Sequence, residues 1–344
     1  MSVRILTGDA FAMLQTLDAE SVDECVTSPP YWRQRDYGID GQLGLEQTPE
    51  DYVEGLRRVF AEVRRVLKPS GSLFLNVGDK WASGGNGGGG SFMEQRGDAW
   101  AHSKGAKGWR SPPSGYKDKD LVGVPWMLAF ALRADGWYLR QCNIWAKPNC
   151  MPESVTDRST AAHEYVFHLS KSNSYYYDDE RARTPAAPSS ETRLAQDVEA
   201  QEGSERANGG AKTNGPMKAV QRRTDKQRGH SRKHNGFNDR WDAMSVAEQR
   251  AQGANLRSVW WISPAQYGEG HYAVMPDALA EICIVAGCPP GGTVIDPFGG
   301  AGTVGLVADR LQRDAILIEL NPEYAAMAER RIRGDAPMFA EVSA

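Results

Sequence analysis

A glycine-rich loop lies between an apolar segment and a helix near the end of this 344-residue chain. Residues 293–295 form a predicted strand, and residues 296–303 read Asp-Pro-Phe-Gly-Gly-Ala-Gly-Thr. A helix to about Leu311 follows, then a strand at 315–318 that ends in Glu319. This order predicts a nucleotide-binding unit, because glycines let the backbone approach a ligand and the acid can accept hydrogen bonds from ribose hydroxyls.

The loop alone leaves the cofactor open. Residues 300–305 also satisfy the dinucleotide pattern GxGxxG, so the loop fits both a nicotinamide dinucleotide and S-adenosylmethionine. Only a short tail follows Glu319, so we expect the remaining strands of the fold to come from upstream. That order is unusual for a dinucleotide enzyme. Asp296 adds a carboxylate at the carboxyl end of its strand, where ligands bind in such sheets.

Upstream segments alternate between predicted strands and helices. The clearest helix covers 49–67, where Tyr52, Leu56 and Phe60 are among the apolar residues on one face. The alternation predicts an α/β fold with a mostly parallel sheet and helices on both faces. The other predicted upstream elements are strands at 3–6, 22–26, 72–77, 137–145 and 164–169 and helices at 10–17, 125–135 and 276–286; a last helix is predicted at 322–333.

Two polar stretches interrupt this pattern. Residues 83–117 are predicted to form a flexible insertion, and residues 179–255 lack apolar periodicity and are rich in Gly, Ser, Asn, Arg and Lys. We therefore divide the chain into 1–178, an inserted surface-contact region at 179–255, and 256–344, which carries the glycine loop.

Composition excludes several classes of protein. No apolar run approaches the length of a membrane span, and no signal-peptide core opens the chain, so a cytoplasmic protein is expected. The five cysteines are scattered without zinc-finger spacing, and we expect reduced thiols and no metal. The formal net charge of −4 argues weakly against nucleic acid, but a basic run between Arg206 and Lys233 could bind phosphate or be a solvated loop.

A rigid turn follows the predicted strand at 22–26. Ser28, Pro29, Pro30 and Tyr31 form it, and the two prolines remove two backbone donors. What remains is a surface of acceptors, the Ser28 hydroxyl oxygen and the Pro29 carbonyl, beside an aromatic ring. Such a surface suits the exocyclic amine of an extruded base, because two acceptors can hold the amine hydrogens while Tyr31 stacks on the ring. The alternative is a structural turn with a core tyrosine.

Together these motifs resemble the DNA amino-methyltransferases, in the group whose Ser-Pro-Pro-Tyr catalytic motif precedes the FxGxG cofactor motif. The resemblance implies the S-adenosylmethionine-dependent, Rossmann-like methyltransferase fold in circularly permuted form, with 179–255 as an inserted target-recognition region. It implies catalytic roles for residues 28–31, a base pocket that includes Trp32 and Lys147, and DNA contacts by Arg222, Arg223, Lys226 and Arg228. The residues that it implies for S-adenosylmethionine are Asp9, His271, Pro276, Asp296, Phe298, Gly300, Gly302, Thr303 and Glu319.

The predicted target is the N4 amine of cytosine. Ser at position 28 resembles the cytosine-N4 enzymes, whereas Asp or Asn is usual there in adenine-N6 enzymes. Adenine N6 is the nearest alternative, and transfer to RNA or a protein glutamine, a nicotinamide-dependent oxidoreductase and a DNA-binding protein without catalysis are more distant. The resemblance implies double-stranded DNA as partner, allows a cognate restriction endonuclease, and leaves a homodimer open.

Overall fold

The computed structural model of the chain describes residues 1–82, 104–105, 115–185, 244–245, 248, 251–265, 274–335 and 341–343. The chain divides into two compact units, one of residues 1–178 with 257–344 and one of residues 179–256. Within the second unit, Thr184 and Ala254 form a short antiparallel bridge. The role of this unit in target recognition stays a prediction, because most of its residues lie outside the described ones, as does most of the predicted insertion at 83–117.

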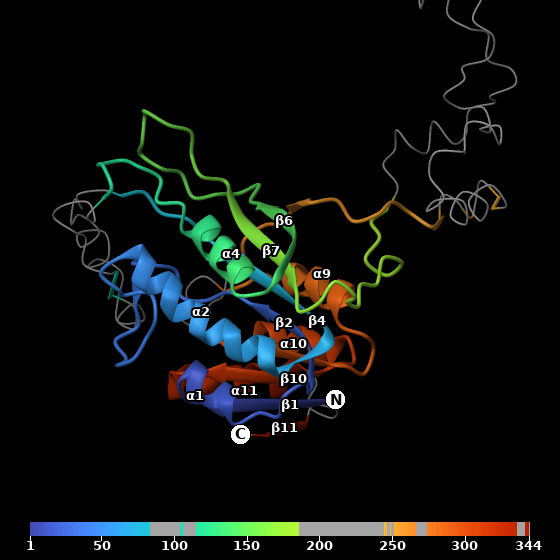
Figure 1. The fold of residues 1–344 in the computed structure, drawn as a ribbon. Helices are drawn as coiled ribbons and strands as arrows, with labels where there is room; N and C mark the ends of the chain where they lie inside the picture. Colours follow the sequence, from blue (N-terminus) through green and yellow to red (C-terminus); the bar gives the residue numbers. More distant parts are fainter. Residues whose placement is uncertain are drawn as a thin grey trace, which may run out of the picture. The chain divides into compact units, whose positions relative to one another are not determined.

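The first unit is built on a central sheet (Figure 1), to which the described residues contribute nine strands. These are β1 (Ser2–Thr7), β2 (Val22–Thr27), β4 (Leu67–Val77), β6 (Tyr138–Ala146), β7 (His163–Ser170), β8 (Val259–Trp261), β9 (Thr293–Asp296), β10 (Asp314–Glu319) and β11 (Glu341–Ser343). Their order is β11-β1-β10-β9-β2-β4-β7-β6-β8. β7 runs antiparallel to both neighbours, and the other pairs in this sheet are parallel.

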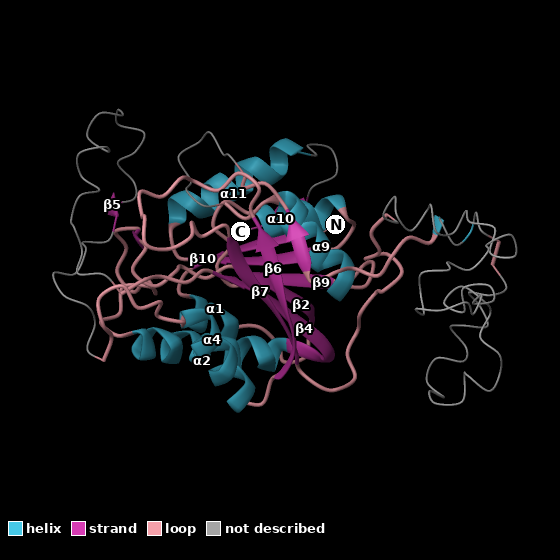
Figure 2. Cartoon of the chain, turned by 90° about the horizontal axis from the view of Figure 1, so that it is seen from above, coloured by secondary structure: helices cyan, strands magenta, loops and turns pink. Residues whose placement is uncertain are grey.

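Helices cover both faces of the sheet (Figure 2). One face carries α1 (Ala10–Gln15), α2 (Pro49–Val66) and α4 (Val124–Ala134). The other carries α9 (Asp277–Gly287), α10 (Thr303–Arg310) and α11 (Pro322–Asp335). The predicted architecture, a mostly parallel sheet between two helical layers, is confirmed. A separate pair of short strands, β3 (Arg35–Asp36) and β5 (Lys104–Gly105), was not predicted.

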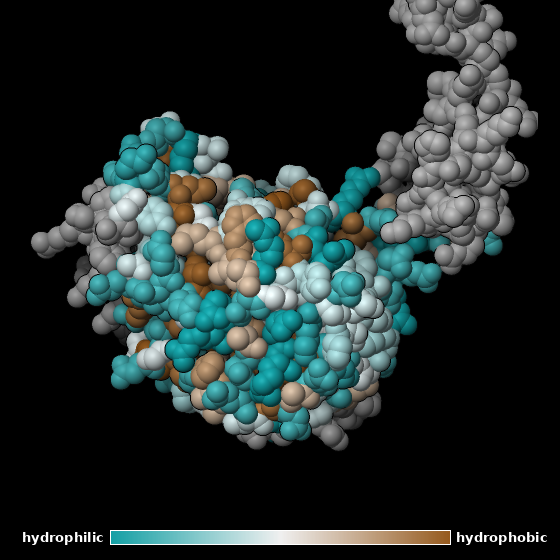
Figure 3. Space-filling model, viewed as in Figure 1, coloured by the Kyte–Doolittle hydropathy of each residue, from teal (hydrophilic) through white to brown (hydrophobic). Residues whose placement is uncertain are grey.

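The sequence of α2 explains where this helix begins and which face it buries. Thr48 caps it by accepting a hydrogen bond from the Asp51 amide at 3.1 Å, and proline occupies the first turn. Its apolar stripe is buried in the core and contributes about 1.5–3 kcal/mol for each large side chain. The outer face of α2 is hydrophilic, whereas apolar side chains gather over α4, where Phe130 is 47% exposed (Figure 3).

Strand β4 begins earlier than the sequence predicts. Proline and glycine at 69–71 predict a turn, but the strand already starts at Leu67, which pairs with Val22. A bulge between Val22 and Glu24 absorbs the irregularity. Gly71 is closely packed there, because a Cβ on it would lie 3.0 Å from the Asp23 carbonyl oxygen.

Five neighbouring parallel strands bring their carboxyl ends to one edge of the sheet. β1, β10, β9, β2 and β4 all end there, and Thr7 pairs with Glu319 at the end of β1 and β10. Ligands of open α/β sheets bind beyond such an edge. Within the described ranges, no helix combines the length and the apolar character needed to cross a membrane.

Candidate active site

A buried hydrogen bond joins β2 and β9 at their carboxyl ends. Thr27 Oγ1 donates to Asp296 Oδ1 at 2.6 Å, and the Phe298 amide donates to the same oxygen at 3.0 Å. Asp296 is 4% exposed. Burial raises its pKa to about 7, both hydrogen bonds oppose that rise, and the nearby Glu319 adds to it. The Ser-Pro-Pro-Tyr turn and the glycine loop therefore start from two strand ends that are tied together.

The glycine loop folds around the end of β10. The Gly299 amide donates to the Ile318 carbonyl and the Gly302 amide donates to the Gly299 carbonyl, both at 2.8 Å. Gly300 and Gly302 have φ angles of +51° and +78°, a left-handed backbone that glycine adopts without strain. Glu319 Oε2 accepts from the Gly300 amide at 2.8 Å, which fixes the predicted ribose acid against the loop.

Glu319 and Asp9 lie at the ends of adjacent strands. The Gly8 amide donates to the Glu319 carbonyl at 2.9 Å, so the residue that follows, Asp9, lies beside the end of β10. Glu319 Oε1 accepts from the Asn321 amide at 2.8 Å, and burial raises the pKa of this carboxyl. Asp9 is exposed and caps α1, accepting from the Ala12 amide at 2.9 Å.

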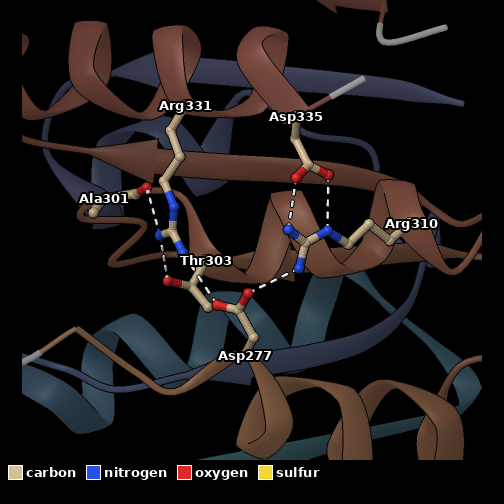
Figure 4. Close-up of polar contacts among 6 residues, drawn as sticks. All are labelled: Asp277, Ala301, Thr303, Arg310, Arg331 and Asp335. Carbon is tan, nitrogen blue, oxygen red and sulfur yellow. Dashed lines mark hydrogen bonds and ion pairs between the residues drawn. The ribbon is translucent and has the colours of Figure 1, made fainter. Parts of the chain in front are cut away.

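Charged side chains support the glycine loop from the side of α11 (Figure 4). Arg331 donates to Thr303 Oγ1 at 2.8 Å and to the Ala301 carbonyl at 3.2 Å. Its other terminal nitrogen donates to Asp277 at 3.1 Å, and Arg310 donates to the second oxygen of Asp277 at 2.8 Å. The Thr303 hydroxyl thus takes part in holding α9, α10 and α11 together at the loop.

For several predicted site residues the structure gives only a position or no description. Pro276 is buried and directly precedes α9. His271 lies outside the described residues, and so do the predicted DNA contacts Arg222, Arg223, Lys226 and Arg228. Their roles stay predictions.

The turn after β2 is anchored by polar groups from β4 and β7. The Tyr31 hydroxyl lies 2.5 Å from Glu164 Oε2 and 3.1 Å from Asn76 Oδ1. Ser28 Oγ lies 3.4 Å from the Tyr31 hydroxyl. Lys147, from the residues after β6, donates to Glu164 Oε1. Burial, followed by the neighbouring Glu164 carboxylate, raises the pKa of Tyr31 well above its ordinary value, so the phenol keeps its proton at neutral pH.

The two proline carbonyls of the turn differ in their surroundings. The Pro30 carbonyl accepts from the Tyr52 hydroxyl of α2 at 2.8 Å. Among the described residues, no hydrogen bond reaches the Pro29 carbonyl. The Tyr31 ring lies against the backbone after β4, where a Cβ on Gly78 would be 2.7 Å from the ring. The Pro29 carbonyl, the Ser28 hydroxyl and the held ring of Tyr31 therefore provide the acceptors and the aromatic surface that a base amine requires.

The two residues predicted for the base pocket have different positions. Lys147 lies in the polar cluster with Glu164, and its ammonium is 4.4 Å from the Trp145 ring centroid. Trp32 is instead buried in the core, 3% exposed, and its indole nitrogen donates to the Glu46 carbonyl at 3.1 Å. Trp32 thus fixes the loop after the turn.

Sequence reasoning missed Asn76, Gly78 and Glu164. All three lie on or beside strands whose pairing brings them to the turn, and Asn76 is opposite Val166 in the antiparallel ladder of β4 and β7. One sequence signal was available. Asn76 interrupts the buried run 73–77, which is otherwise apolar, and this marks a polar group that needs a partner.

The sheet order and the glycine loop closed by Glu319 define an α/β protein of the Rossmann-like methyltransferase fold. Two of the solved structures that share this fold show the extent of the similarity. A Thermus thermophilus protein described as a putative DNA modification methylase, complexed with S-adenosyl-L-methionine, is 22% identical with a TM-score of 0.56, and the match covers 99% of this chain and 97% of that one. The cytosine-N4-specific PvuII DNA methyltransferase is 16% identical with a TM-score of 0.57, and the match covers 100% of this chain and 95% of that one.

The sequence family is defined more sharply. The DNA methylase family that comprises the N6 and N4 enzymes matches residues 22–330. The Type II methyltransferase M.SmaI of Serratia marcescens is 41% identical over 333 residues, which cover 96% of this chain and 91% of the relative. M.Cfr9I of Citrobacter freundii is 36% identical over 331 residues, which cover 96% of this chain and 88% of the relative. The chain belongs to this DNA methylase family, which confirms the predicted DNA amino-methyltransferase.

Proposed function

We propose that this protein transfers a methyl group from S-adenosylmethionine to the N4 amine of cytosine in double-stranded DNA. The observation that carries the proposal is the turn after β2, where Ser28 Oγ lies 3.4 Å from the Tyr31 hydroxyl and no hydrogen bond from the described residues reaches the Pro29 carbonyl. Serine, in place of Asp or Asn, supports cytosine N4 over adenine N6, as the resemblance implies.

The residues at the strand ends fit S-adenosylmethionine. The Glu319 carboxylate accepts from backbone amides, among them those of Gly300 and Asn321, and its two oxygens together offer about four lone pairs, so capacity is left for a ribose hydroxyl. The left-handed backbone at Gly300 and Gly302 lets the chain approach the ligand. Asp9 would receive the adenine amine, and Asp296, at the carboxyl end of β9, would accept a hydrogen bond from the ammonium or the ribose of the cofactor.

The chain's own residues orient the target. S-adenosylmethionine supplies, when bound, a methyl group already activated on a sulfonium. Ser28 Oγ and the Pro29 carbonyl hold the two hydrogens of the amine, so that the nitrogen lone pair points away from both acceptors. The Tyr31 ring stacks on the extruded base, and the absence of a side chain at Gly78 leaves the room that this ring occupies. Catalysis then rests chiefly on orientation and exclusion of water.

The proposal extends to DNA contact and biological context. Arg222, Arg223, Lys226 and Arg228 would bind phosphates, so neutralising the three arginines should flatten the salt dependence of DNA affinity, and an unchanged slope would contradict this contact. The relatives are named as Type II methyltransferases, which supports a role in restriction and modification beside a cognate endonuclease. DNA methylated by this protein should then resist that endonuclease. A homodimer and a cytoplasmic location remain part of the proposal.

The test is nucleoside mass spectrometry of DNA incubated with the purified protein and methyl-labelled S-adenosylmethionine. Labelled N4-methylcytosine is the expected product. Labelled N6-methyladenine would overturn the choice of target amine, and labelled RNA or protein with no labelled DNA would overturn the choice of substrate. Ser28→Ala serves as the matched control, because it removes one acceptor and leaves the glycine loop intact.

A further inference from the structure

Ser28 has a hydroxyl that can either donate or accept a hydrogen bond. A base amine ready for methylation presents two hydrogens, so it needs an acceptor at this position. If the hydroxyl hydrogen pointed at the amine, Ser28 would repel the group that it must hold. The neighbours of Ser28 therefore determine whether its hydroxyl accepts a hydrogen bond from the amine or points its own hydrogen at it.

The Ser28 hydroxyl lies 3.4 Å from the Tyr31 hydroxyl, and two acceptors lie close to that phenol. Glu164 Oε2 lies 2.5 Å from it and Asn76 Oδ1 lies 3.1 Å from it. A carboxylate has no hydrogen to give, so Tyr31 must donate its single hydrogen in this direction. The Tyr31 oxygen then faces Ser28 with lone pairs only, and Ser28 is the donor of that contact.

The hydrogen bonds from Ser28 to Tyr31 and from Tyr31 to Glu164 form a relay. Further hydrogen bonds hold its final acceptor, Glu164, in place. Lys147 donates to Glu164 Oε1, which leaves Oε2 facing Tyr31. The Asn76 amide nitrogen donates to Glu164 Oε2 at 3.0 Å and to the Tyr165 carbonyl at 3.2 Å. These two bonds fix the orientation of the amide, so that its oxygen is directed at Tyr31. The polarity of the relay thus runs from Ser28 through Tyr31 to Glu164.

We propose that Glu164 is a positioning residue that fixes Ser28 as a hydrogen-bond acceptor for the target amine, acting through the Tyr31 hydroxyl. With the Ser28 hydrogen committed to Tyr31, the lone pairs of Ser28 Oγ are left for the amine. This inference rests on the proposed function, since it requires an exocyclic amine at the turn. It also explains how a serine, whose hydroxyl can donate or accept, can serve as an acceptor at the position where the resemblance implies Asp or Asn in adenine-N6 enzymes.

The first experiment replaces Glu164 by glutamine, which keeps the size of the side chain but brings an NH2 group that can donate to Tyr31. The relay can then reverse and turn the Ser28 hydrogen toward the amine. Single-turnover methyl transfer by Glu164→Gln should fall about 10- to 100-fold, while affinities for S-adenosylmethionine and DNA stay within about twofold. Glu62→Gln is the matched control, because Glu62 pairs with Arg65 on α2 away from the turn, and it should keep wild-type rates.

The second experiment removes the middle of the relay. Tyr31→Phe keeps the stacking ring and leaves Lys147, Glu164 and Asn76 unchanged. The rate of methyl transfer by Tyr31→Phe should fall by a similar factor. The double variant with Glu164→Gln should be slower than Tyr31→Phe by less than about twofold. Wild-type transfer by either single variant, or an undiminished effect of Glu164→Gln in the Tyr31→Phe protein, would overturn the inference. Absence of methylated base with the wild-type protein would instead overturn the proposed function.

Discussion

Gly302 and Ala328 approach each other so closely that a Cβ on the glycine would lie 2.8 Å from that of the alanine. Helix α11 therefore packs directly on the start of α10. Position 302 requires glycine because of this packing and because of its φ of +78°, so the requirement exists before any ligand binds.

Gly302→Ala should consequently destabilise the protein itself. We expect a loss of about 1–3 kcal/mol, from left-handed strain together with overpacking against α11. Urea unfolding measures the change as a lower midpoint. Ala328→Gly, which costs about 1 kcal/mol in a helix interior by itself, should cost less when added to Gly302→Ala, because it then also removes the clash. An unaltered midpoint for Gly302→Ala would contradict the packing.

The bond between Thr27 and Asp296 should contribute measurably to stability. Thr27→Val keeps the shape of the side chain and removes the hydroxyl donor, so that the buried carboxyl keeps the bond from the Phe298 amide. We expect a loss of about 1–3 kcal/mol in unfolding free energy. Thr27→Ser, which retains the hydroxyl, is the control and should lose less. Equal losses for the two variants would show that packing of the methyl group matters more than the bond.

Asp296 should make stability depend on pH. Its pKa of about 7 in the folded protein exceeds the ordinary value of about 4, so the folded state keeps a proton that the unfolded chain has released. This contribution is complete below about pH 4 and is lost as the pH rises through about 7, with a slope of at most about 1.4 kcal/mol per pH unit.

Asp296→Asn tests that dependence, because asparagine does not titrate. The wild type should lose unfolding free energy relative to the variant as the pH rises from about 4 to about 7. Above about pH 7 the difference between the two proteins should stay constant. Unfolding in urea at a series of pH values gives this difference directly. A difference that stays constant across the range would mean that Asp296 titrates normally.

Much of the fold could be predicted because its elements carry strong local patterns. The apolar stripe of α2 and the uniformly buried β2 identify a helix and a strand without knowledge of their neighbours. The short strand at Val259–Trp261 has no such pattern, and Trp261 is 74% exposed. Its pairing with β6 arises from tertiary contact alone.

The candidate site divides in the same way. Ser28, Tyr31 and Glu319 belong to contiguous motifs, so the sequence predicts them, although their roles await the experiments above. Asn76 and Glu164 lie 88 positions apart and meet only through the ladder between β4 and β7. A single polar residue in a strand can equally face solvent, so spacing alone could not connect these two to the turn.

Gly78 should control the position of the Tyr31 ring. Gly78→Ala places a methyl group 2.7 Å from the ring, which must move by a fraction of an ångström or more. We expect methyl transfer to fall about 10- to 100-fold while affinity for S-adenosylmethionine is retained, because the glycine loop is unaffected. Gly334→Ala is the matched control, since a Cβ there meets no atom within 4 Å. Normal transfer by Gly78→Ala would argue against a stacking role for Tyr31.

The central claim is that the turn after β2 holds the amine that receives the methyl group. The most direct measurement compares Ser28→Ala with the wild type in single-turnover methyl transfer to DNA and in equilibrium binding of S-adenosylmethionine. Transfer should slow by about 100-fold or more with binding unchanged, because Ser28 contacts the target and not the cofactor. A wild-type rate of transfer, or an equal loss of transfer and binding, would contradict the claim.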